Sequence, residues 1–477
     1  MKLKLTYKKA AAIFLVSFFL LVVIFLWKEI EDSPEFEPVE STRSPNTYER
    51  IKKKGTLKAV VKYNSSSYFV YRGRPMGFEY ELLQELCDHL KVNLEIAVNN
   101  DINETIQGLK NNRYDLMAQN LTVTGNRKDD LSFTTPFIQT QQVLVQRKRN
   151  RNRAEPNFLN SVLDLANKTV YVEKNSAYLR RLNHLSDEIG GTINVVSDSV
   201  YGVEALIARV AEGIIDYTVC DENIGILNQF YHPEIDISLY VSFPQNISWA
   251  VKPGAVQWQT IVDNWINEFK KTRKYHFLYY KYFESPRAAE RRGSEFNSIS
   301  GNRISKYDAL IKQLSGQWDW RLISAIVYHE SRFNEDAGSW AGAYGLMQLM
   351  PVVAETYGIE NVEDPRQNLT GGIKLLNALN NRFIKSIPDS TNRIKFVLAA
   401  YNIGLGHVYD AQRLASKYGK DPKIWDNSVE FYLRNKSQEK YYTDEVVRFG
   451  YCRGHEATDY VRKVSNFYKQ YINLIEK

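Results

Sequence analysis

A single carboxylate within an apolar helical pattern is the first residue in this sequence that could do chemistry. Residues 318–332 read WDWRLISAIVYHESR, in which Ile323, Ile326, Val327 and Glu330 recur at three- and four-residue spacing. Side chains at this spacing share one face of a helix. Burial disfavours a charged carboxylate, so we expect the pKa of Glu330 to lie above its ordinary value of about 4.3. A carboxylic acid that keeps its proton near neutral pH can act as a general acid.

The same segment also fits a purely structural role. Glu330 stands at the end of the apolar stripe, where it could reach solvent and pair with Arg332 or Lys312. On these residues alone the structural role is favoured, and both interpretations stay open.

Three further motifs follow this helix in the order that a known family shows. They are GAYGLMQLMP at 342–351, AAYNIG at 399–404 and HEATDYV at 455–461. Together with Glu330-Ser331, they resemble the soluble-lytic-transglycosylase domain, a mainly α, lysozyme-like fold, over about residues 307–471. The resemblance implies a lyase of cell wall turnover that acts on peptidoglycan glycan strands. It would cleave the β-1,4 bond between N-acetylmuramic acid and N-acetylglucosamine and leave a 1,6-anhydromuramoyl end.

The resemblance also implies a role for each motif residue. Glu330 would protonate the leaving glycosidic oxygen and then, as a carboxylate, accept the proton of the muramoyl 6-hydroxyl. Ser331 would steady Glu330 or the muramoyl ring, and Tyr460 would orient Glu330. The remaining substrate-binding residues would be Met347, Gln348, Tyr401 and Asn402.

Two other chemistries are weighed against this one. A hydrolytic muramidase needs a second carboxylate, and the candidates Glu335 and Asp336 lie in a polar loop where carboxylates are usually solvated. The His329-Glu330 pair begins a zinc-protease motif, but Phe333 occupies the position of its second histidine. The histidines are scattered, so we expect a lyase with no metal and no cofactor.

The preceding region alternates strand and helix patterns, which predicts a mostly parallel sheet. Strands are expected at 56–62, 93–98, 114–121, 169–172 and 216–219, and helices at 78–89 and 106–110. The stretches RGRPMGFEYELLQELCDHL and NNRYDLMAQNLTVTGNRKDDLSFTTPF resemble family-three solute-binding domains of the amino-acid-binding type. This resemblance implies an α/β fold of two lobes with a ligand in the cleft between them, as in periplasmic binding proteins.

The solute-binding resemblance also suggests which residues hold a ligand. Arg127 would pair with a ligand carboxylate, assisted by Thr122, because a planar guanidinium forms two hydrogen bonds with a carboxylate. Ser176 precedes an expected helix whose free N–H groups could accept an anion, and Asp221 would hold a ligand amine. The alternatives are that Arg127 only pairs with Asp129 or Asp130 on the surface, or that the cleft binds nothing.

An uncharged apolar segment lies near the N-terminus. Residues 10–27 read AAAIFLVSFFLLVVIFLW, and at about 1.5 Å per residue they span roughly 27 Å, close to the thickness of a bilayer. Lysines precede the segment and acidic residues follow it, which predicts that the rest of the chain lies outside the cytoplasm. A retained anchor is favoured over a cleaved signal peptide, because the segment ends in Phe25, Leu26 and Trp27 rather than small residues.

These patterns divide the chain as follows: a basic cytoplasmic end at 1–9, an anchor or signal segment at 10–27, a tether at 28–54, a solute-binding-like domain at 55–285, a linker at 286–303 and a catalytic domain at 304–477. With 477 residues and a net charge of +7, the chain is too weakly basic to indicate nucleic acid. Three widely spaced cysteines exclude a disulfide scaffold.

The sequence therefore predicts a membrane-associated enzyme on the periplasmic side of the cell envelope that resembles the membrane-bound lytic transglycosylases. Family resemblance points to the outer membrane, whereas a retained anchor points to the inner one. The expected partners are glycan strands, the membrane, and a muropeptide or amino acid that occupies the solute-binding-like domain and regulates the enzyme. The alternatives are a hydrolytic muramidase and a catalytically silent receptor for peptidoglycan or solutes.

Overall fold

The computed structural model describes residues 46–149, 157–199, 202–299 and 301–475. The chain divides into a short unit, Met1–Asn46, and one compact unit, Thr47–Lys477. No helix in the described residues is both long and apolar enough to cross a membrane. The expected anchor at 10–27 lies outside the described residues, as does most of the expected tether. The last part of that tether, Thr47–Lys54, forms helix α2, whose Ile51 is buried.

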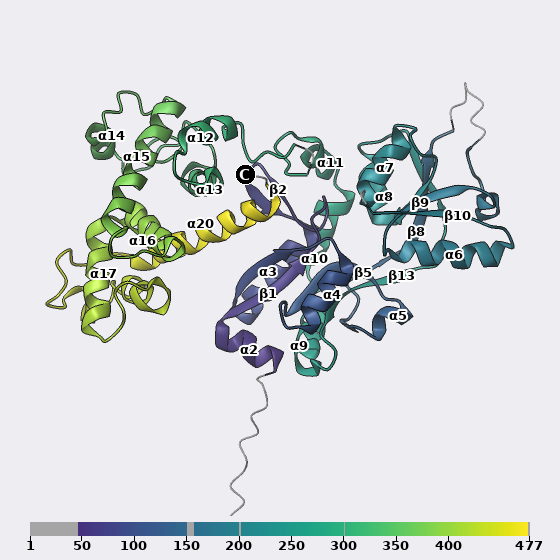
Figure 1. Cartoon of the computed structure of the whole chain (residues 1–477), viewed down its shortest axis with the longest axis horizontal. Coiled ribbons are helices and arrows are strands. Elements are labelled where there is room, and N and C mark those ends of the chain that lie inside the picture. The colour runs from purple at the N-terminus through teal and green to yellow at the C-terminus, as the bar shows by residue number, and fades with distance from the viewer. Residues whose placement is uncertain (1–45, 150–156, 200–201, 300, 476–477) are drawn as a thin grey trace, which may run out of the picture. The chain divides into compact units, whose positions relative to one another are not determined.

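The first lobe is built on a mixed sheet in which β1 pairs in parallel with β4 and β5 (Figure 1). Strand β13 lies antiparallel to β5 and continues the sheet to β6, while β7 also pairs with β13. The elements of this lobe are α2 (Thr47–Lys54), β1 (Thr56–Val61), β2 (Phe69–Tyr71), β3 (Arg74–Met76), α3 (Phe78–Leu90), β4 (Asn93–Val98), α4 (Ile102–Lys110), β5 (Leu116–Thr122), α5 (Gly125–Lys128), β6 (Ser132–Phe133), β7 (Ile138–Thr140), β13 (Gln245–Val251), α9 (Val256–Phe269) and α10 (Arg273–Tyr279).

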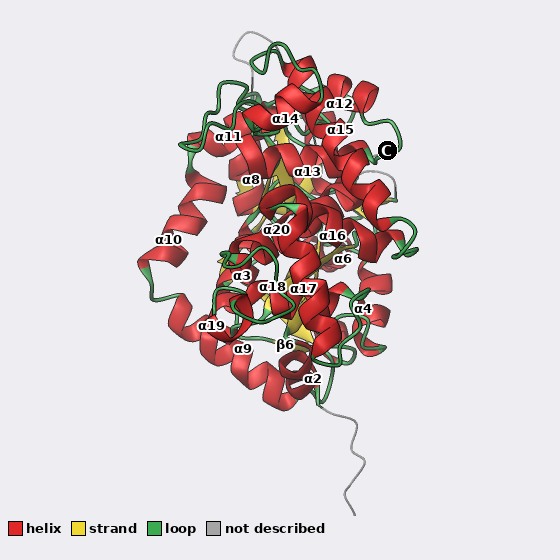
Figure 2. Cartoon of the chain, turned by 90° about the vertical axis from the view of Figure 1, so that its left-hand side faces the viewer, coloured by secondary structure: helices red, strands yellow, loops and turns green. Residues whose placement is uncertain are grey.

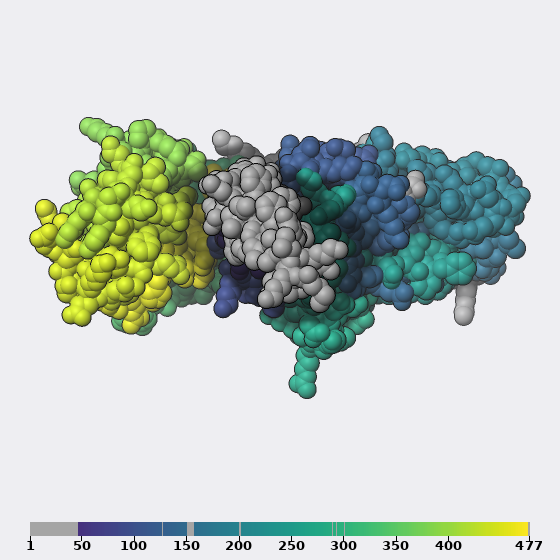
Figure 3. Space-filling model, turned by 90° about the horizontal axis from the view of Figure 1, so that it is seen from below, coloured from purple at the N-terminus to yellow at the C-terminus, as the bar shows by residue number. Residues whose placement is uncertain are grey.

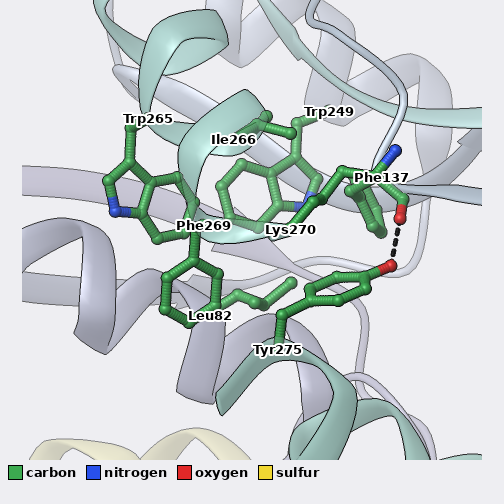
Figure 4. Close-up of a pocket in the computed structure, with 8 residues that line it drawn as sticks. All are labelled: Leu82, Phe137, Trp249, Trp265, Ile266, Phe269, Lys270 and Tyr275. Atoms are coloured by element: carbon green, nitrogen blue, oxygen red, sulfur yellow. Dashed lines mark hydrogen bonds between the residues drawn. The ribbon is translucent and has the colours of Figure 1, made fainter. Parts of the chain in front are cut away.

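An aromatic cluster fills the core of this lobe between β13, α3, α9 and α10 (Figure 4). The rings of Trp249 and Trp265 are stacked with centroids 6.2 Å apart, and Trp265 stacks on Phe269 at 4.8 Å. The hydroxyl of Tyr275 donates a hydrogen bond to the carbonyl of Phe137. Large rings buried together in this way contribute much of the apolar area that stabilises a lobe.

The second lobe is a separate five-stranded sheet in the order β10-β9-β11-β8-β12. Strands β9, β10 and β11 run parallel, and β8 is antiparallel to β11 and β12. The elements are β8 (Gln142–Arg147), β9 (Thr169–Glu173), α6 (Ala177–Ile189), β10 (Asn194–Asp198), α7 (Val203–Ala211), β11 (Thr218–Asp221), α8 (Glu222–Gln229) and β12 (Ile235–Tyr240). Two short connections, β7 to β8 and β12 to β13, join the lobes, which is the two-lobed α/β architecture expected from the sequence.

The C-terminal part is helical (Figure 2), and its surface is coloured green to yellow in Figure 3. Helix α13 packs against α12 and α20, and α16 packs against α15, α17 and α20. Helix α11 lies in the expected linker, where the buried Asn297 follows it. The helices are α11 (Pro286–Gly293), α12 (Asp308–Leu314), α13 (Trp320–Ser331), α14 (Pro351–Thr356), α15 (Pro365–Phe383), α16 (Ser390–Ile403), α17 (Leu405–Lys417), α18 (Glu430–Arg434), α19 (Glu439–Tyr442) and α20 (Gly454–Leu474).

A fully buried ion pair joins α17 to the residues that follow α18. Lys436 and Asp410 both have 0% exposed side chains, and the ammonium of Lys436 donates to the carboxylate of Asp410. The same carboxylate accepts hydrogen bonds from the backbone N–H groups of Arg448 and Phe449, at 2.8 and 2.9 Å. His407 completes the group, because its Nδ1 lies 2.8 Å from the Lys436 ammonium.

We predict that Lys436→Met lowers the free energy of unfolding by up to about 3–5 kcal/mol, because it removes the fully buried counter-ion of Asp410 and leaves that carboxylate paired only with the partly exposed Arg413. Lys271→Met is the matched control, since Lys271 pairs with Glu268 on the surface and such pairs contribute only about 0–1 kcal/mol. Urea titration followed by far-UV circular dichroism measures both. Equal effects of the two substitutions would contradict this account.

Candidate active site

Helix α13 is buried on nearly all sides, so Glu330 lies at the end of a central helix rather than on a single apolar stripe. The helix begins at Asp319, whose side chain accepts a hydrogen bond from the backbone N–H of Arg321. The Arg321 guanidinium is bonded to the same carboxylate and to the carbonyl of Ile475, beyond the end of α20. These contacts hold α13 firmly against α20, where Tyr460 is located.

Glu330 and Tyr460 form the central contact of the site. The Tyr460 hydroxyl donates a hydrogen bond of 2.6 Å to Oε1 of Glu330. Burial raises the pKa of Glu330 to about 7, although the Tyr460 hydrogen bond acts in the opposite direction by stabilising the carboxylate. The apolar pattern around Glu330 in the sequence predicted this raised pKa. A carboxyl group whose pKa lies near neutral pH can donate a proton and accept one back.

The loop with the GLMQ motif is fixed to α13 and to α16 through its backbone. Ser331 donates from Oγ to the carbonyl of Leu346 at 2.9 Å, and Tyr401 donates to the carbonyl of Met347 at 2.7 Å. Ser331 is buried, and its hydroxyl is directed at the loop. Glu330 is among the charges that raise the pKa of Tyr401, after burial, which agrees with a position close to Glu330.

The other predicted cleft residues differ in how far their side chains are exposed to solvent. Met347 is fully buried, with its sulfur against Gly372, so it lies in the core beneath the loop. Gln348 is half-buried with a φ of 48°, and its amide donates to the carbonyls of Ala337 and Gly345 at 2.7 and 3.0 Å. Asn402 is exposed on α16. Of these three residues, Gln348 and Asn402 therefore reach the protein surface.

Asn368 is a site-building residue that the sequence reasoning did not identify. Its side chain is buried and accepts from the backbone N–H of Met347 at 2.8 Å, while its amide donates to the carbonyls of Tyr344 and Val362, both at 2.9 Å. A Cβ on Gly345 would lie 2.2 Å from its Nδ2, so this contact requires glycine at position 345. The signal that could have identified it is a polar asparagine among the apolar residues that form the buried face of α15.

The loop after α13 does not offer a second carboxylate for hydrolysis. Glu335 accepts a hydrogen bond from Tyr307 and pairs with Lys306 at 3.0 Å, and these two contacts lower its pKa. It is therefore held as an anion by partners of its own. Asp336 is exposed. His329 is half-buried, which lowers its pKa to about 4 and keeps it neutral.

The four residues predicted to hold a ligand in the solute-binding-like domain fall at the boundary between the lobes. Arg127 donates to the carbonyl of Thr122 in its own lobe at 3.1 Å and to that of Asn175 in the other lobe at 3.3 Å. Asp129 and Asp130 are not its hydrogen-bond partners here, and Asp130 pairs with Lys110. Arg127 therefore bridges the lobes instead of forming the surface ion pair that was the alternative.

Asp221 and Ser176 belong to the second lobe, where Ser176 follows Asn175, whose carbonyl accepts from Arg127. Asp221 ends β11, and burial raises its pKa to about 7 while the Tyr178 hydrogen bond opposes the rise. Its Oδ1 and the Oγ of Ser176 are buried without a hydrogen-bond partner. Asp221 also lines a cavity of about 420 Å³ together with residues of both lobes, among them Lys62, Asn120, Glu173 and Glu204.

Comparison with known proteins agrees with this geometry. Residues 310–424 match the family described as Transglycosylase SLT domain, and residues 49–285 match the family described as Bacterial extracellular solute-binding proteins, family 3. A two-lobed solute-binding domain followed by a helical transglycosylase domain thus defines a lytic transglycosylase with a solute-binding module.

Relatives that match along nearly the whole chain identify the family. Membrane-bound lytic murein transglycosylase F of Desulfosudis oleivorans is 32% identical over 89% of this chain and 92% of its own length. The proteins of the same name from Pseudomonas putida and Aliivibrio fischeri are 31% and 29% identical, each over 89% of this chain, and are covered over 86% and 84% of their lengths. The chain belongs to the membrane-bound lytic murein transglycosylase F family.

We predict that Tyr460→Phe shifts the pH dependence of the reaction upward. Loss of the hydrogen bond that stabilises the Glu330 carboxylate raises the pKa of Glu330 above about 7, so the protonated form persists to higher pH. The decline of kcat/KM at alkaline pH should therefore move to higher pH. A pH profile of glycan cleavage measures it.

Tyr307→Phe is the matched control, because it removes a tyrosine–carboxylate hydrogen bond from Glu335 instead. The alkaline limb of the pH profile of Tyr307→Phe should coincide with that of the unmodified enzyme. A downward shift in Tyr460→Phe, or the same shift in both variants, would show that Tyr460 does not set the pKa of Glu330.

Proposed function

We propose that this enzyme cleaves the β-1,4 bond between N-acetylmuramic acid and N-acetylglucosamine with Glu330 as its single acid and base. The observation that carries the proposal is a half-buried Glu330 whose pKa is raised to about 7 and whose carboxyl group is held by Tyr460. The protonated carboxyl donates its proton to the leaving glycosidic oxygen. The resulting carboxylate then accepts the proton of the muramoyl 6-hydroxyl as that oxygen bonds to the anomeric carbon.

This sequence of steps consumes no water and leaves a 1,6-anhydromuramoyl end. It needs only one titrating group near pH 7, because the proton leaves Glu330 and returns to it. The neighbouring groups hold the site in place. Tyr460 fixes the carboxyl group of Glu330, and Ser331, Tyr401 and Asn368 hold the loop around Gln348. Hydrolysis is disfavoured because Glu335, the nearest alternative carboxylate in sequence, is paired with Lys306 and Tyr307.

The enzyme's place in the cell follows from the N-terminal segment and the relatives' names. We propose that residues 10–27 attach the chain to a membrane and that both domains work on the periplasmic side of the envelope, where peptidoglycan lies. The charge distribution around the segment supports this orientation, and the related enzymes are named membrane-bound.

For the solute-binding-like domain we propose a ligand with an α-amino-acid group, such as an amino acid or a muropeptide. Arg127 would hold its carboxylate and Asp221 its amine: Arg127 bridges the two lobes, and Asp221 lines a cavity formed by residues of both lobes. Lys62 and Glu173 already pair across the lobes at 3.2 Å. A ligand regulates the enzyme only if it binds one arrangement of the lobes better than another.

The reaction is tested by the ends that the full-length enzyme produces from purified sacculi, which mass spectrometry identifies. We predict 1,6-anhydromuramoyl ends. Glu330→Gln should lower the rate by about 100- to 10,000-fold, since it removes the general acid and base, and should keep binding to sacculi. Glu335→Gln is the matched control and should keep the rate. Reducing ends, or loss of activity only in Glu335→Gln, would indicate a hydrolase.

The ligand is tested by calorimetry of the full chain with amino acids and with a purified muropeptide. We predict that binding weakens below about pH 7, because protonation of Asp221 removes the negative charge that attracts the amine. Arg127→Met should abolish the binding heat. Arg113→Met is the matched control, since Arg113 pairs with Glu104 on the surface. Unchanged binding by Arg127→Met would exclude this cleft.

A further inference from the structure

The turn that follows the catalytic glutamate has an unfavourable backbone conformation. Helix α13 ends at Ser331, and the next two residues, Arg332 and Phe333, have φ values of 56° and 61°. Neither is glycine, and the left-handed region is unfavourable for residues that carry a Cβ. Conformations of this kind persist only where the surrounding structure fixes them. The contacts of this turn therefore bear on how Glu330 is held.

The tip of the β2–β3 hairpin, in the solute-binding-like domain, lies against this turn. The hairpin turns at Arg72 and Gly73, with φ values of 48° and 75°. A Cβ on Gly73 would lie 2.5 Å from Cε2 of Phe333, 2.9 Å from Cδ2 of Tyr328 and 3.2 Å from the hydroxyl of Tyr471. Tyr328 precedes Glu330 by two residues and Phe333 follows it by three, so the tip contacts α13 and its turn on both sides of Glu330.

Further contacts fix the same group of residues. Tyr471, from α20, donates its hydroxyl hydrogen to the carbonyl of Gly73. The ring of Tyr328 stacks on Phe467, also from α20, with centroids 4.9 Å apart. The guanidinium of Arg332 lies 4.5 Å from the centre of the Tyr328 ring and bonds to its hydroxyl. The turn is thus enclosed by the hairpin tip and α20.

The hairpin is itself anchored to the segment that joins the two domains. Arg72 donates from its backbone N–H to the carbonyl of Phe296 at 2.9 Å, and Tyr71 forms a bridge with Asn297. Ser298 exchanges hydrogen bonds with Val70 at 2.8 and 2.9 Å. Figure 1 shows β2 beside the C-terminal end of α20, which it contacts. The tip is therefore a fixed support rather than a free loop.

We propose that Gly73 is a positioning residue for the transglycosylase reaction: the hairpin tip sets the turn at Arg332 and Phe333, and through it the direction of the Glu330 carboxyl. This inference rests on the proposed role of Glu330. Gly73 itself touches no substrate and acts through Phe333 and Tyr328. Only glycine leaves room for both rings, so any larger residue must displace one of them. Misplacement of a catalytic group by about 1 Å can cost roughly 100-fold in rate.

The test compares Gly73→Ala with Gly55→Ala in the full-length enzyme. Both glycines lie in the first lobe with positive φ, 75° and 62°, so alanine meets a similar backbone penalty at each. Nothing lies within 4 Å of a Cβ on Gly55. We expect Gly73→Ala to lower kcat by about 10- to 100-fold with KM within about twofold, and to move the alkaline limb of the pH profile downward as Glu330 becomes more solvated. Gly55→Ala should behave as the unmodified enzyme.

A second substitution tests whether the clash itself is the cause. Phe333→Leu shortens the side chain that a Cβ on Gly73 would strike, so the double variant with Gly73→Ala should recover part of the lost kcat. Non-additive effects of this kind are expected only for residues in contact. Recovery supports the proposal. A double variant as slow as the product of the two single losses contradicts it.

A third variant keeps the proposal testable if Gly73→Ala does not fold. Tyr471→Phe removes only the hydroxyl that bonds to the Gly73 carbonyl, and it should lower kcat several-fold and shift the alkaline limb. The proposal is overturned if folded Gly73→Ala or Tyr471→Phe keeps both kcat and the pH profile, or if Gly55→Ala loses as much kcat as Gly73→Ala. Should Glu330→Gln remain active, the proposed reaction fails instead, so the two failures are distinguishable.

Discussion

The hydrogen bond between Tyr460 and Glu330, in a site largely withdrawn from water, is the interaction on which the proposed chemistry of this enzyme depends. Burial and the tyrosine act in opposite directions on the same carboxyl group, one favouring the protonated form and the other the anion. Their balance leaves the pKa near 7. A single residue can then serve as acid in one half of the reaction and as base in the other, which removes the need for a second carboxylate.

Much of the remaining catalytic domain serves to hold that pair in place. Asp319 and Arg321 secure the start of α13 and connect it to the end of α20. Ser331 and Tyr401 bond to the backbone of the GLMQ loop, and Asn368 supports the loop from beneath. Several residues of the family motifs therefore act through structure, because they fix the backbone of the loop beside Glu330.

The sequence predicted the elements with strong local signals better than the contacts between them. Strand β4 occupies the expected 93–98, and α3 starts at the expected Phe78, because apolar periodicity is a local property. Helix α4 starts earlier than expected, at Ile102, since Asp101 caps it. Hairpin β2–β3 was missed because three-residue strands show no alternation. The positive φ values at Arg332 and Phe333 depend on partners such as Gly73, distant in sequence, that no local pattern reveals.

The most direct test of the account is the pKa of the Glu330 carboxyl group itself. Carbon-13 NMR of enzyme labelled at the glutamate carboxyl carbons, with Glu330→Gln to assign the resonance, follows its titration in the absence of substrate. The account predicts a midpoint near pH 7. A midpoint of about 4.3, the pKa of an ordinary solvated glutamate, would mean that Glu330 is already ionised at neutral pH and cannot supply the first proton.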